Sequence, residues 1–330
     1  MIYLWFVPVS DLQLDLRFKL NSLAKELRKE ASSFGYKHAP SNFYGISYFF
    51  ITYFLYFFCI WLLVYSIKSN ASNGILILIS VALSFAIVRF QFLLHECSHA
   101  VLVNNRKLND FIGELAGYTV AYPFKIYRRN HAKHHALTGT IKDPEIDNFI
   151  VDQNLKSLRI QFLFKTVKSL FFVDAIQLII SLFAKQDKEI NQKQNCKNYS
   201  PWLLLVSILI QSCVVISFFG EFNLHYIMTF IVFYLISMMS FAFVLNRFRG
   251  MSEHSISTNL DKYDFTLTHK KRLLTFLIAP LNFNYHYEHH VWPEVSSFWY
   301  PKLNQFVISK GYSKYQRNGY LETLRYIWTK

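Results

Sequence analysis

Long apolar runs separated by short polar stretches dominate the pattern of this chain. Positions 38–67 contain no Asp, Glu, Lys or Arg, and a helix needs about 20 predominantly apolar residues to cross a bilayer core. After a polar break at 68–74, a second apolar run extends over residues 75–94 and contains one Arg as its single charged residue. The pattern predicts a transmembrane helical hairpin at residues 42–94 with a very short outer loop.

The same plan recurs in the second half of the chain. Residues 201–219 carry no charged side chain, 220–223 form a short break around Glu221, and residues 224–245 are again free of charge. We therefore predict a second hairpin at residues 201–245. The expected fold class is all-α and integral to the membrane, with four spans capped by a helical cytoplasmic region, in a single domain covering residues 1–330.

The basic residues indicate how these hairpins are oriented. Loops that remain in the cytoplasm are enriched in Lys and Arg, and the two short loops hold only Lys68 between them. We therefore expect both termini to be cytoplasmic, together with the large middle segment. The predicted cytoplasmic segments are residues 1–41, 95–200 and 246–330.

Two of the cytoplasmic stretches have their own helical pattern. Residues 11–34 repeat Leu at helical spacing, which predicts an amphipathic helix at the membrane surface. Residues 158–183 mix apolar clusters with Lys and Arg, which suits a pair of interfacial helices; a buried third hairpin is the alternative. Residues 1–10 lack the basic region of a signal sequence, so we expect them to be retained.

Composition and charge agree with a membrane protein. The chain has 52% hydrophobic and 18% aromatic residues against 17% charged ones, a membrane composition. A net charge of +14 could indicate a nucleic-acid partner, but the basic residues are not gathered on one domain. The predicted membrane topology explains the basic residues better, because Lys and Arg are enriched on the cytoplasmic side. Arg247 and Arg249 are interpreted as anchors on that side. The four cysteines have no C-x-x-C spacing, which predicts neither disulfides nor a thiolate metal site.

Histidine supplies the candidate chemistry. Eight of the twelve histidines fall into three short clusters, and positions i, i+3 and i+4 of a helix share one face. Grouped imidazoles are typical ligands of transition metals. The remaining His38, His225 and His269 are isolated and are interpreted as surface or interfacial residues. The clustered histidines are His95, His99, His131, His134, His135, His286, His289 and His290.

The positions of the clusters predict that they converge. A helix rises about 1.5 Å per residue, so continuing the second span past Arg89 brings His95 roughly 9 Å further toward the cytoplasm. Continuing the fourth span past Leu245 brings Glu253 and His254 about 14 Å further. Eight or nine imidazoles are too many for one ion and suit two. Ligand type leaves zinc, copper, iron and nickel open.

These residues resemble a known family. The phrases H-E-C-S-H at 95–99, H-A-K-H-H at 131–135 and H-Y-E-H-H at 286–290, the last followed by Val-Trp-Pro, are similar to the histidine boxes of the membrane fatty acid desaturase and hydroxylase family. Carotenoid ketolases share these boxes. The resemblance implies two irons, molecular oxygen and removal of hydrogen from an unactivated carbon chain, and it implies that His254 is a ninth ligand.

Departures from the family pattern bear on the substrate. The first box has three intervening residues, and Gly250 stands where the acyl-CoA desaturases have an asparagine near the metal. An acyl-lipid or other lipid substrate is therefore favoured over acyl-CoA. Acidic residues beside the boxes can accept the second ring N–H of a ligand histidine. These are Glu96, Asp143, Asp147, Glu253 and Glu288.

The chain must obtain electrons from a partner, because it has no G-x-G-x-x-G nucleotide motif and no His-Pro-Gly-Gly haem motif. We expect an external donor, a ferredoxin or a cytochrome b5-type carrier. Basic residues could dock that donor or contact lipid headgroups. They are Lys125, Arg128, Arg129, Lys270, Lys271 and Arg272.

Alternatives in other functional classes remain. A hydroxylase or ketolase could use the same scaffold. The first box also satisfies H-E-x-x-H, the zinc protease pattern in which Glu96 would be the general base, but that interpretation leaves two boxes unexplained. A metal transporter or sensor would need ionisable residues at mid-bilayer depth. We expect a lipid desaturase.

Overall fold

The computed structural model describes most of the chain beyond the N-terminal segment. The described residues are Lys29 and 41–138, 142–145, 155–183, 201–254, 266–271, 273–311 and 316–329. The predicted amphipathic helix at 11–34 therefore lies outside the described residues, apart from Lys29, as do His38 and Asp147.

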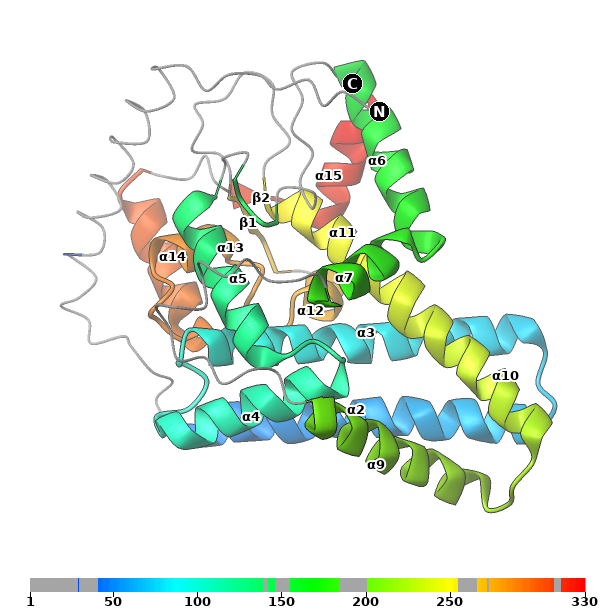
Figure 1. Ribbon diagram of the computed structural model, residues 1–330. Helices are drawn as coiled ribbons and strands as arrows, with labels where there is room; N and C mark the ends of the chain where they lie inside the picture. Colours follow the sequence, from blue (N-terminus) through cyan, green and yellow to red (C-terminus); the bar gives the residue numbers. More distant parts are fainter. Residues whose placement is uncertain are drawn as a thin grey trace.

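Two long antiparallel helices form the centre of the molecule (Figure 1). Helix α2 covers Asn42–Lys68 and helix α3 covers Asn73–Ser98, so they correspond to the first predicted hairpin. The turn between them is tight, with the amide of Ala71 donating to the carbonyl of Ser66 at 2.9 Å. Helix α3 continues four residues beyond the predicted span, to Ser98, and carries the start of the first histidine box.

A second pair of apolar helices crosses the first. Helix α9 covers Pro201–Phe219, and α10 (Leu224–Leu235), the π-helical segment η3 (Ile236–Phe241) and α11 (Ala242–Glu253) follow. The last three run on as one helix, Leu224–Glu253. Within the described part of the chain, three helices are long and apolar enough to cross a membrane; the described apolar part of α9, Leu205–Phe219, is shorter.

One contact ties the two pairs together at the end remote from the histidines. The Lys68 ammonium group donates to the carbonyl of Phe219, the last residue of α9, at 2.6 Å. A cation is favourable at this position because carbonyl groups at a helix C-terminus carry partial negative charge.

Shorter elements gather around the other end of the α2–α3 pair (Figure 1). They are α4 (Arg106–Thr119), α5 (Phe124–Leu137), α12 (Leu273–Ile278), α13 (His286–Val291), η4 (Ser297–Trp299), α14 (Tyr300–Ser309) and α15 (Tyr320–Thr329). The chain departs from the all-α expectation in one detail, because β1 (Thr268–His269) pairs in parallel with β2 (Gln316–Arg317).

The stretch predicted as an interfacial helix pair does form two helices. Helix α6 covers Leu155–Leu170 and α7 covers Val173–Phe183, and with 16 and 11 residues both are too short to span a bilayer core. Within the described residues 155–183, neither helix is long enough for a third membrane-spanning hairpin. Asp174 of α7 pairs with Arg247 of α11 at 2.8 Å, with both side chains buried. The charge of Arg247 is therefore paired inside the protein.

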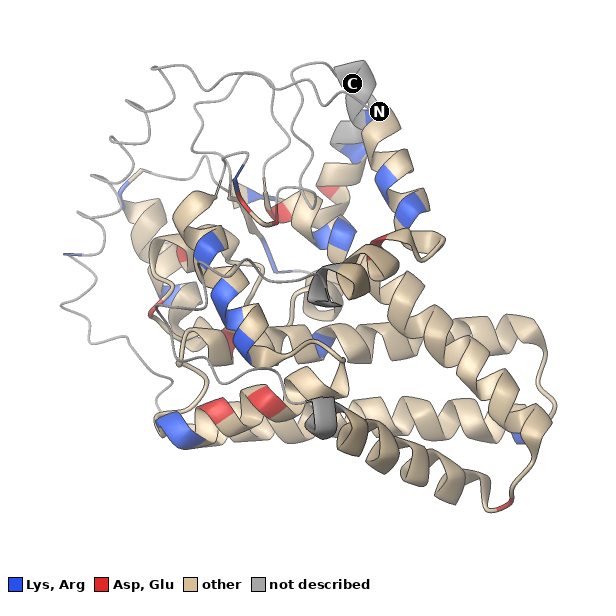
Figure 2. Ribbon diagram, in the orientation of Figure 1, with Lys and Arg blue, Asp and Glu red and all other residues tan. Residues whose placement is uncertain are grey.

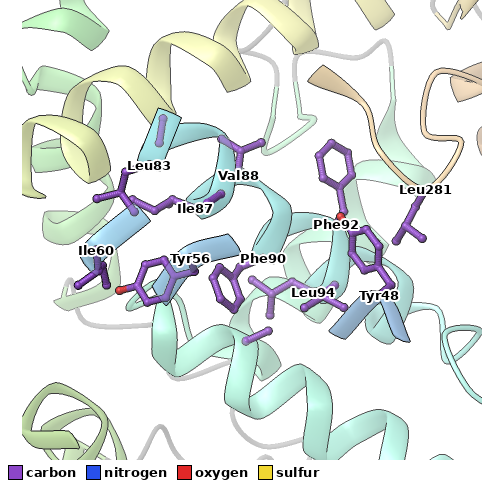
Figure 3. Packing of buried hydrophobic residues seen from close by; sticks show 14 of the residues in the cluster. Tyr48, Tyr56, Ile60, Leu83, Ile87, Val88, Phe90, Phe92, Leu94 and Leu281 are labelled. Atoms are coloured by element: carbon purple, nitrogen blue, oxygen red, sulfur yellow. The ribbon is translucent and has the colours of Figure 1, made fainter. Parts of the chain in front are cut away.

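Apolar packing between α2 and α3 supplies much of the core (Figure 3). Tyr56 and Phe90 are fully buried and meet edge to face at 5.3 Å between ring centroids. The opposite side of α2 exposes large apolar residues such as Phe50 and Phe54. Figure 2 shows that these helices are almost free of charge, so the exposed apolar side is suited to contact with lipid.

Candidate metal centre

Four segments bring the histidines together. Helix α3 carries His95 in its last turn, His99 follows directly after its end, and α5 carries the second cluster. The short helix α13 carries the third, and His254 follows directly after α11. Figure 1 shows α5 and α13 near the end of α3 that is remote from the α2–α3 turn. The convergence expected from the helix rise is present.

The first group draws on all three boxes. One ring nitrogen from each member lies within 4.8 Å of the corresponding atoms of all the others. The Nε2 of His135 is 3.0 Å from that of His131 and 2.8 Å from that of His289. The members are His95, His99, His131, His135 and His289.

The second group combines His134, His254 and His290, whose ring nitrogens also lie within 4.8 Å of one another. His286 joins its edge, because its Nε2 is 2.8 Å from that of His254 and 3.1 Å from that of His290. The Nε2 atoms of His134 and His290 are 3.4 Å apart and both point into the group. All nine predicted ligands are thus in two adjacent groups.

The spacing of the nitrogens fits a pair of metal ions. Two imidazoles bound to one ion at about 2.1 Å have their nitrogens about 3.0 to 3.4 Å apart for right-angle to tetrahedral geometry. Three of the Nε2 separations, 3.0, 3.1 and 3.4 Å, fall in this range, and two at 2.8 Å lie just below it. In addition, both ring nitrogens of the buried His95 and the Nε2 of His99 have no hydrogen-bond partner among the described residues. Unsatisfied buried nitrogens that face a common point are what a cation would satisfy.

Two of the nitrogens that face away from the groups, those of His134 and His289, are within hydrogen-bond distance of other side chains, and two more, those of His131 and His286, face a carboxylate. The Nδ1 of His134 lies 3.0 Å from the Asp143 carboxylate, and that of His289 lies 2.9 Å from the Tyr300 hydroxyl. The Nδ1 atoms of His131 and His286 lie 3.5 Å from the carboxylates of Glu145 and Glu253 respectively. Such contacts fix the tautomer and the ring orientation of a ligand.

The four acidic residues suggested by the sequence that the structure describes do not behave alike; Asp147 lies outside the described residues. Asp143 and Glu253 do approach a histidine. Glu96 instead accepts hydrogen bonds from the amide and hydroxyl of Ser297 at 3.2 and 2.9 Å. Glu288 is bonded to Thr268 and Asn304. These two carboxylates therefore fasten loops to the boxes rather than contacting histidine rings through their hydrogen bonds.

Sequence reasoning missed Glu145 and Tyr300. A signal for Glu145 was available, because it follows Asp143 and Pro144 in one turn, in which the Glu145 amide donates to Asp143 Oδ1 at 2.8 Å. Tyr300 is eleven positions after His289 and has no motif of its own. Its role depends on how α14 packs against α13.

Burial and charge set the protonation of the rings. Burial lowers the pKa of His289, His290 and His135, and neighbouring imidazoles lower it further. These rings are therefore neutral at pH 7, as metal binding requires. Burial also opposes protonation of His134, but Glu145 and Asp143 outweigh it and raise the pKa of that ring.

The guanidinium of Arg249 lies over the Phe92 ring at 4.7 Å and its Nε is 3.5 Å from Glu253, so Arg249 has partners inside the protein. One further sequence interpretation is corrected here, because His269 is not a surface residue. It is fully buried, with its Nε2 2.9 Å from the Ser252 carbonyl. His225, by contrast, is exposed as expected.

Comparisons with known proteins agree with the histidine pattern. The family model described as Fatty acid desaturase matches residues 69–317. The chain is 33% identical over 58 residues to the chloroplastic Omega-6 fatty acid desaturase of Glycine max, which covers 18% of this chain and 14% of that protein. It is 21% identical over 117 residues to the Fatty acid desaturase of Bacillus subtilis (strain 168), covering 36% and 32% of the two chains.

A third relative is the chloroplastic sn-2 acyl-lipid omega-3 desaturase (ferredoxin) of Helianthus annuus, 31% identical over 64 residues, or 19% of this chain and 14% of that protein. The matched part of the chain thus spans at most 32% of the length of these relatives.

Proposed function

The chain belongs to the fatty acid desaturase family, and from that premise we propose that it is a membrane di-iron enzyme. It uses O2 to introduce a double bond into a fatty acyl or similar long alkyl chain. The observation that carries the proposal is the convergence of nine histidines from four segments into two adjacent groups.

In this proposal the two groups of histidines hold one iron each. Bound iron would supply the activation of O2 and the removal of hydrogen from an unactivated carbon chain. The protein orients the imidazoles through Asp143, Glu145, Glu253 and Tyr300. Phe283 packs edge to face on His95 at 4.4 Å and so excludes water from that side of the cluster.

The protease alternative is disfavoured by the same geometry. A general base must reach the water that it activates, whereas Glu96 is bonded to Ser297. His95 and His99 are also grouped with histidines of both other boxes, which a site of the H-E-x-x-H kind does not require. No observation favours a hydroxylase or ketolase over a desaturase.

We propose that the substrate is an acyl-lipid that reaches the site from the bilayer. Exposed apolar side chains on α2 and α10 support contact with lipid chains. With the basic segments on the cytoplasmic side, the histidine groups and both termini face the cytoplasm.

An external electron carrier completes the proposal. Lys125, Arg129 and Lys133 are four residues apart and so follow one side of α5, and Figure 2 shows these cations along the helix. The opposite side of α5 carries the buried His131 and His134. An acidic carrier docked on α5 would be separated from the histidines by a single helix, about 10 Å across. The name of the Helianthus relative includes ferredoxin, which makes a ferredoxin a suitable first donor to test.

The test combines metal analysis with lipid analysis. We expect about two irons per purified chain and, in a host expressing the chain, lipids that have lost two hydrogen atoms. His134→Ala should abolish the product, while His225→Ala, a change at an exposed histidine outside both groups, should not. Lipids that gain an oxygen atom instead would assign a hydroxylase, and one zinc per chain without iron would refute the di-iron proposal.

A further inference from the structure

The C-terminal helix α15 begins with a buried tyrosine that reaches toward the histidines. Tyr320 is 1% exposed and lies three residues beyond the end of the family match at residue 317. Its hydroxyl donates to Glu253 Oε1 at 2.7 Å. The other oxygen of Glu253 lies 3.5 Å from the Nδ1 of His286 and 3.5 Å from the Nε of Arg249.

The ring of Tyr320 has a defined contact as well as its hydroxyl. It stacks on the His269 ring with centroids 4.2 Å apart and an interplanar angle of 18°. His269 itself is held by Ser252, two residues before His254. The backbone of this region is fixed by the β1–β2 pair, in which the Lys270 amide donates to the Arg317 carbonyl at 2.9 Å.

The same strand pair reaches the third histidine box. The amide of His269 donates to the Asn284 carbonyl at 2.8 Å, and Asn284 Nδ2 donates back to the His269 carbonyl at 2.7 Å. Asn284 is two residues before His286. The start of α15 is therefore fastened both to the end of α11 and to the start of α13.

The far end of α15 is fastened as well. Arg159 of α6 donates to the Trp328 carbonyl at 2.8 Å, and the Phe162 and Trp328 rings meet edge to face at 5.6 Å. Helix α15 thus lies between α6 and the histidine groups, and it has little freedom to withdraw Tyr320.

Without Tyr320, the buried Glu253 carboxylate would have only its two 3.5 Å contacts, to His286 and Arg249, and its side chain could adopt several rotamers. The Tyr320 hydroxyl occupies one oxygen of Glu253, which leaves the other oxygen toward His286 and Arg249. The Nδ1 of His286 faces this oxygen at 3.5 Å, while its Nε2 lies 2.8 Å from that of His254 and 3.1 Å from that of His290. The orientation of a ligand ring thus depends on a residue that touches no histidine of the metal groups.

We propose that Tyr320 is a positioning residue, which acts through Glu253 to aim His286 at the second metal position. This inference rests on the proposed di-iron centre. It assigns a role in metal binding to the segment after residue 317, which the family match does not cover.

The test follows the release of iron from the purified full-length protein to a chelator. We expect the wild-type protein to release its two irons slowly. Tyr320→Phe keeps the ring stack and removes only the hydroxyl. One iron should therefore leave about 10-fold faster, which is the smallest effect usual for loss of a residue that supports a metal ligand. Glu253→Gln should have an effect of about 10- to 100-fold.

A double variant separates positioning from a general loss of stability. If Tyr320 acts through Glu253, then Tyr320→Phe should not increase the iron release rate further in the Glu253→Gln background, because that variant has already lost the carboxylate through which Tyr320 acts. The visible spectrum of the Co2+-loaded protein, which depends on coordination geometry, should change in the same way in both single variants. Replacement of Tyr320 by p-aminophenylalanine, which restores a donor, should return the release rate to near the wild-type value.

Tyr56→Phe is the matched control. Its hydroxyl is also buried and bonded, but to Gln211 and Tyr234 of the apolar helices, so iron release should not change. Additive effects in the double variant, equal loss of both irons, or a Tyr320→Phe protein that does not fold would each overturn the inference, since each indicates a role in the fold as a whole. A wild-type protein that binds no metal would instead refute the proposed function.

Discussion

At the scale of single residues, a hydrogen bond at the outward-facing nitrogen of His134 and of His289 orients the ring so that its other nitrogen faces the metal groups. Asp143 and Tyr300 each lie within 3.0 Å of an Nδ1 atom. The sequence could identify the histidines because each box is local and its spacing matches one helix face. It could not identify Tyr300 or the burial of His269, because both depend on which distant segments pack together.

A prediction at this scale concerns His269. Burial lowers the pKa of His269 to about 4, whereas an unfolded histidine has a pKa of about 6.5. Between pH 4 and about pH 6.5 the His269 ring is therefore protonated in the unfolded state and neutral in the folded state. The stability associated with the neutral ring is therefore complete above pH 6.5 and is lost as the pH falls toward 4, at up to about 1.4 kcal/mol per pH unit.

His269→Gln, which cannot titrate, should remove this part of the pH dependence. Thermal unfolding midpoints measured from pH 7 to pH 4.5 should fall less steeply for the variant than for the wild type. His225→Gln, at an exposed site, serves as the control and should keep the wild-type slope. Parallel curves for His269→Gln and the wild type would show that the ring is not buried in its neutral form.

At the scale of elements, close helix contacts depend on glycine at defined positions. Helices α4 and α5 meet where Gly113 faces Phe124, and a Cβ atom at Gly113 would lie 2.5 Å from the aromatic ring. Phe124 is fully buried and its ring also lies under the Arg128 guanidinium at 4.2 Å. The ring is therefore enclosed, with the Arg128 guanidinium on one face.

Gly113→Ala should therefore shift α4 away from α5, which carries the second histidine box. We expect a loss of about 1–3 kcal/mol of stability, as for other overpacked sites, and faster loss of iron. Gly74→Ala is the control, because its nearest neighbouring atom would be 3.9 Å from the new Cβ. Thermal unfolding in detergent and iron content measure both effects. An unchanged Gly113→Ala protein would contradict the packing described here.

The long helices were predictable because runs without charge define them. Their continuation past Arg89 and Leu245 also followed from helix rise. The π-helical segment η3 was not predictable, because it arises from packing: Ser240 of this segment donates to the Leu170 carbonyl at the end of α6, and no local motif marks that contact.

At the scale of the whole molecule, the two groups of histidines join segments that are otherwise distant in the sequence. Without metal, several imidazoles with unsatisfied nitrogens are buried together. Metal binding to the folded state alone would add stability by mass action, about 2.7 kcal/mol when free metal is at 100 times its dissociation constant.

Removal of iron with a chelator should therefore lower the thermal unfolding midpoint, and Fe2+ added back without oxygen should restore it. The same treatment of a His134→Ala/His290→Ala protein should produce a smaller shift, because the second group is already incomplete. If the midpoint of the wild-type protein is independent of metal, the histidines do not form a metal centre that is coupled to the fold.

The hydrogen bond between Lys68 and Phe219 has a consequence for biogenesis. Lys68 is the lysine of the predicted outer loops, and its partner is the end of a helix synthesised about 150 residues later. The first hairpin must therefore wait in the bilayer with this ammonium group satisfied by water or lipid headgroups until α9 arrives. Replacement of Lys68 by an apolar residue would ease insertion of the first hairpin. It would also remove the contact that aligns α9 when the second hairpin inserts, so this contact couples the two insertion steps.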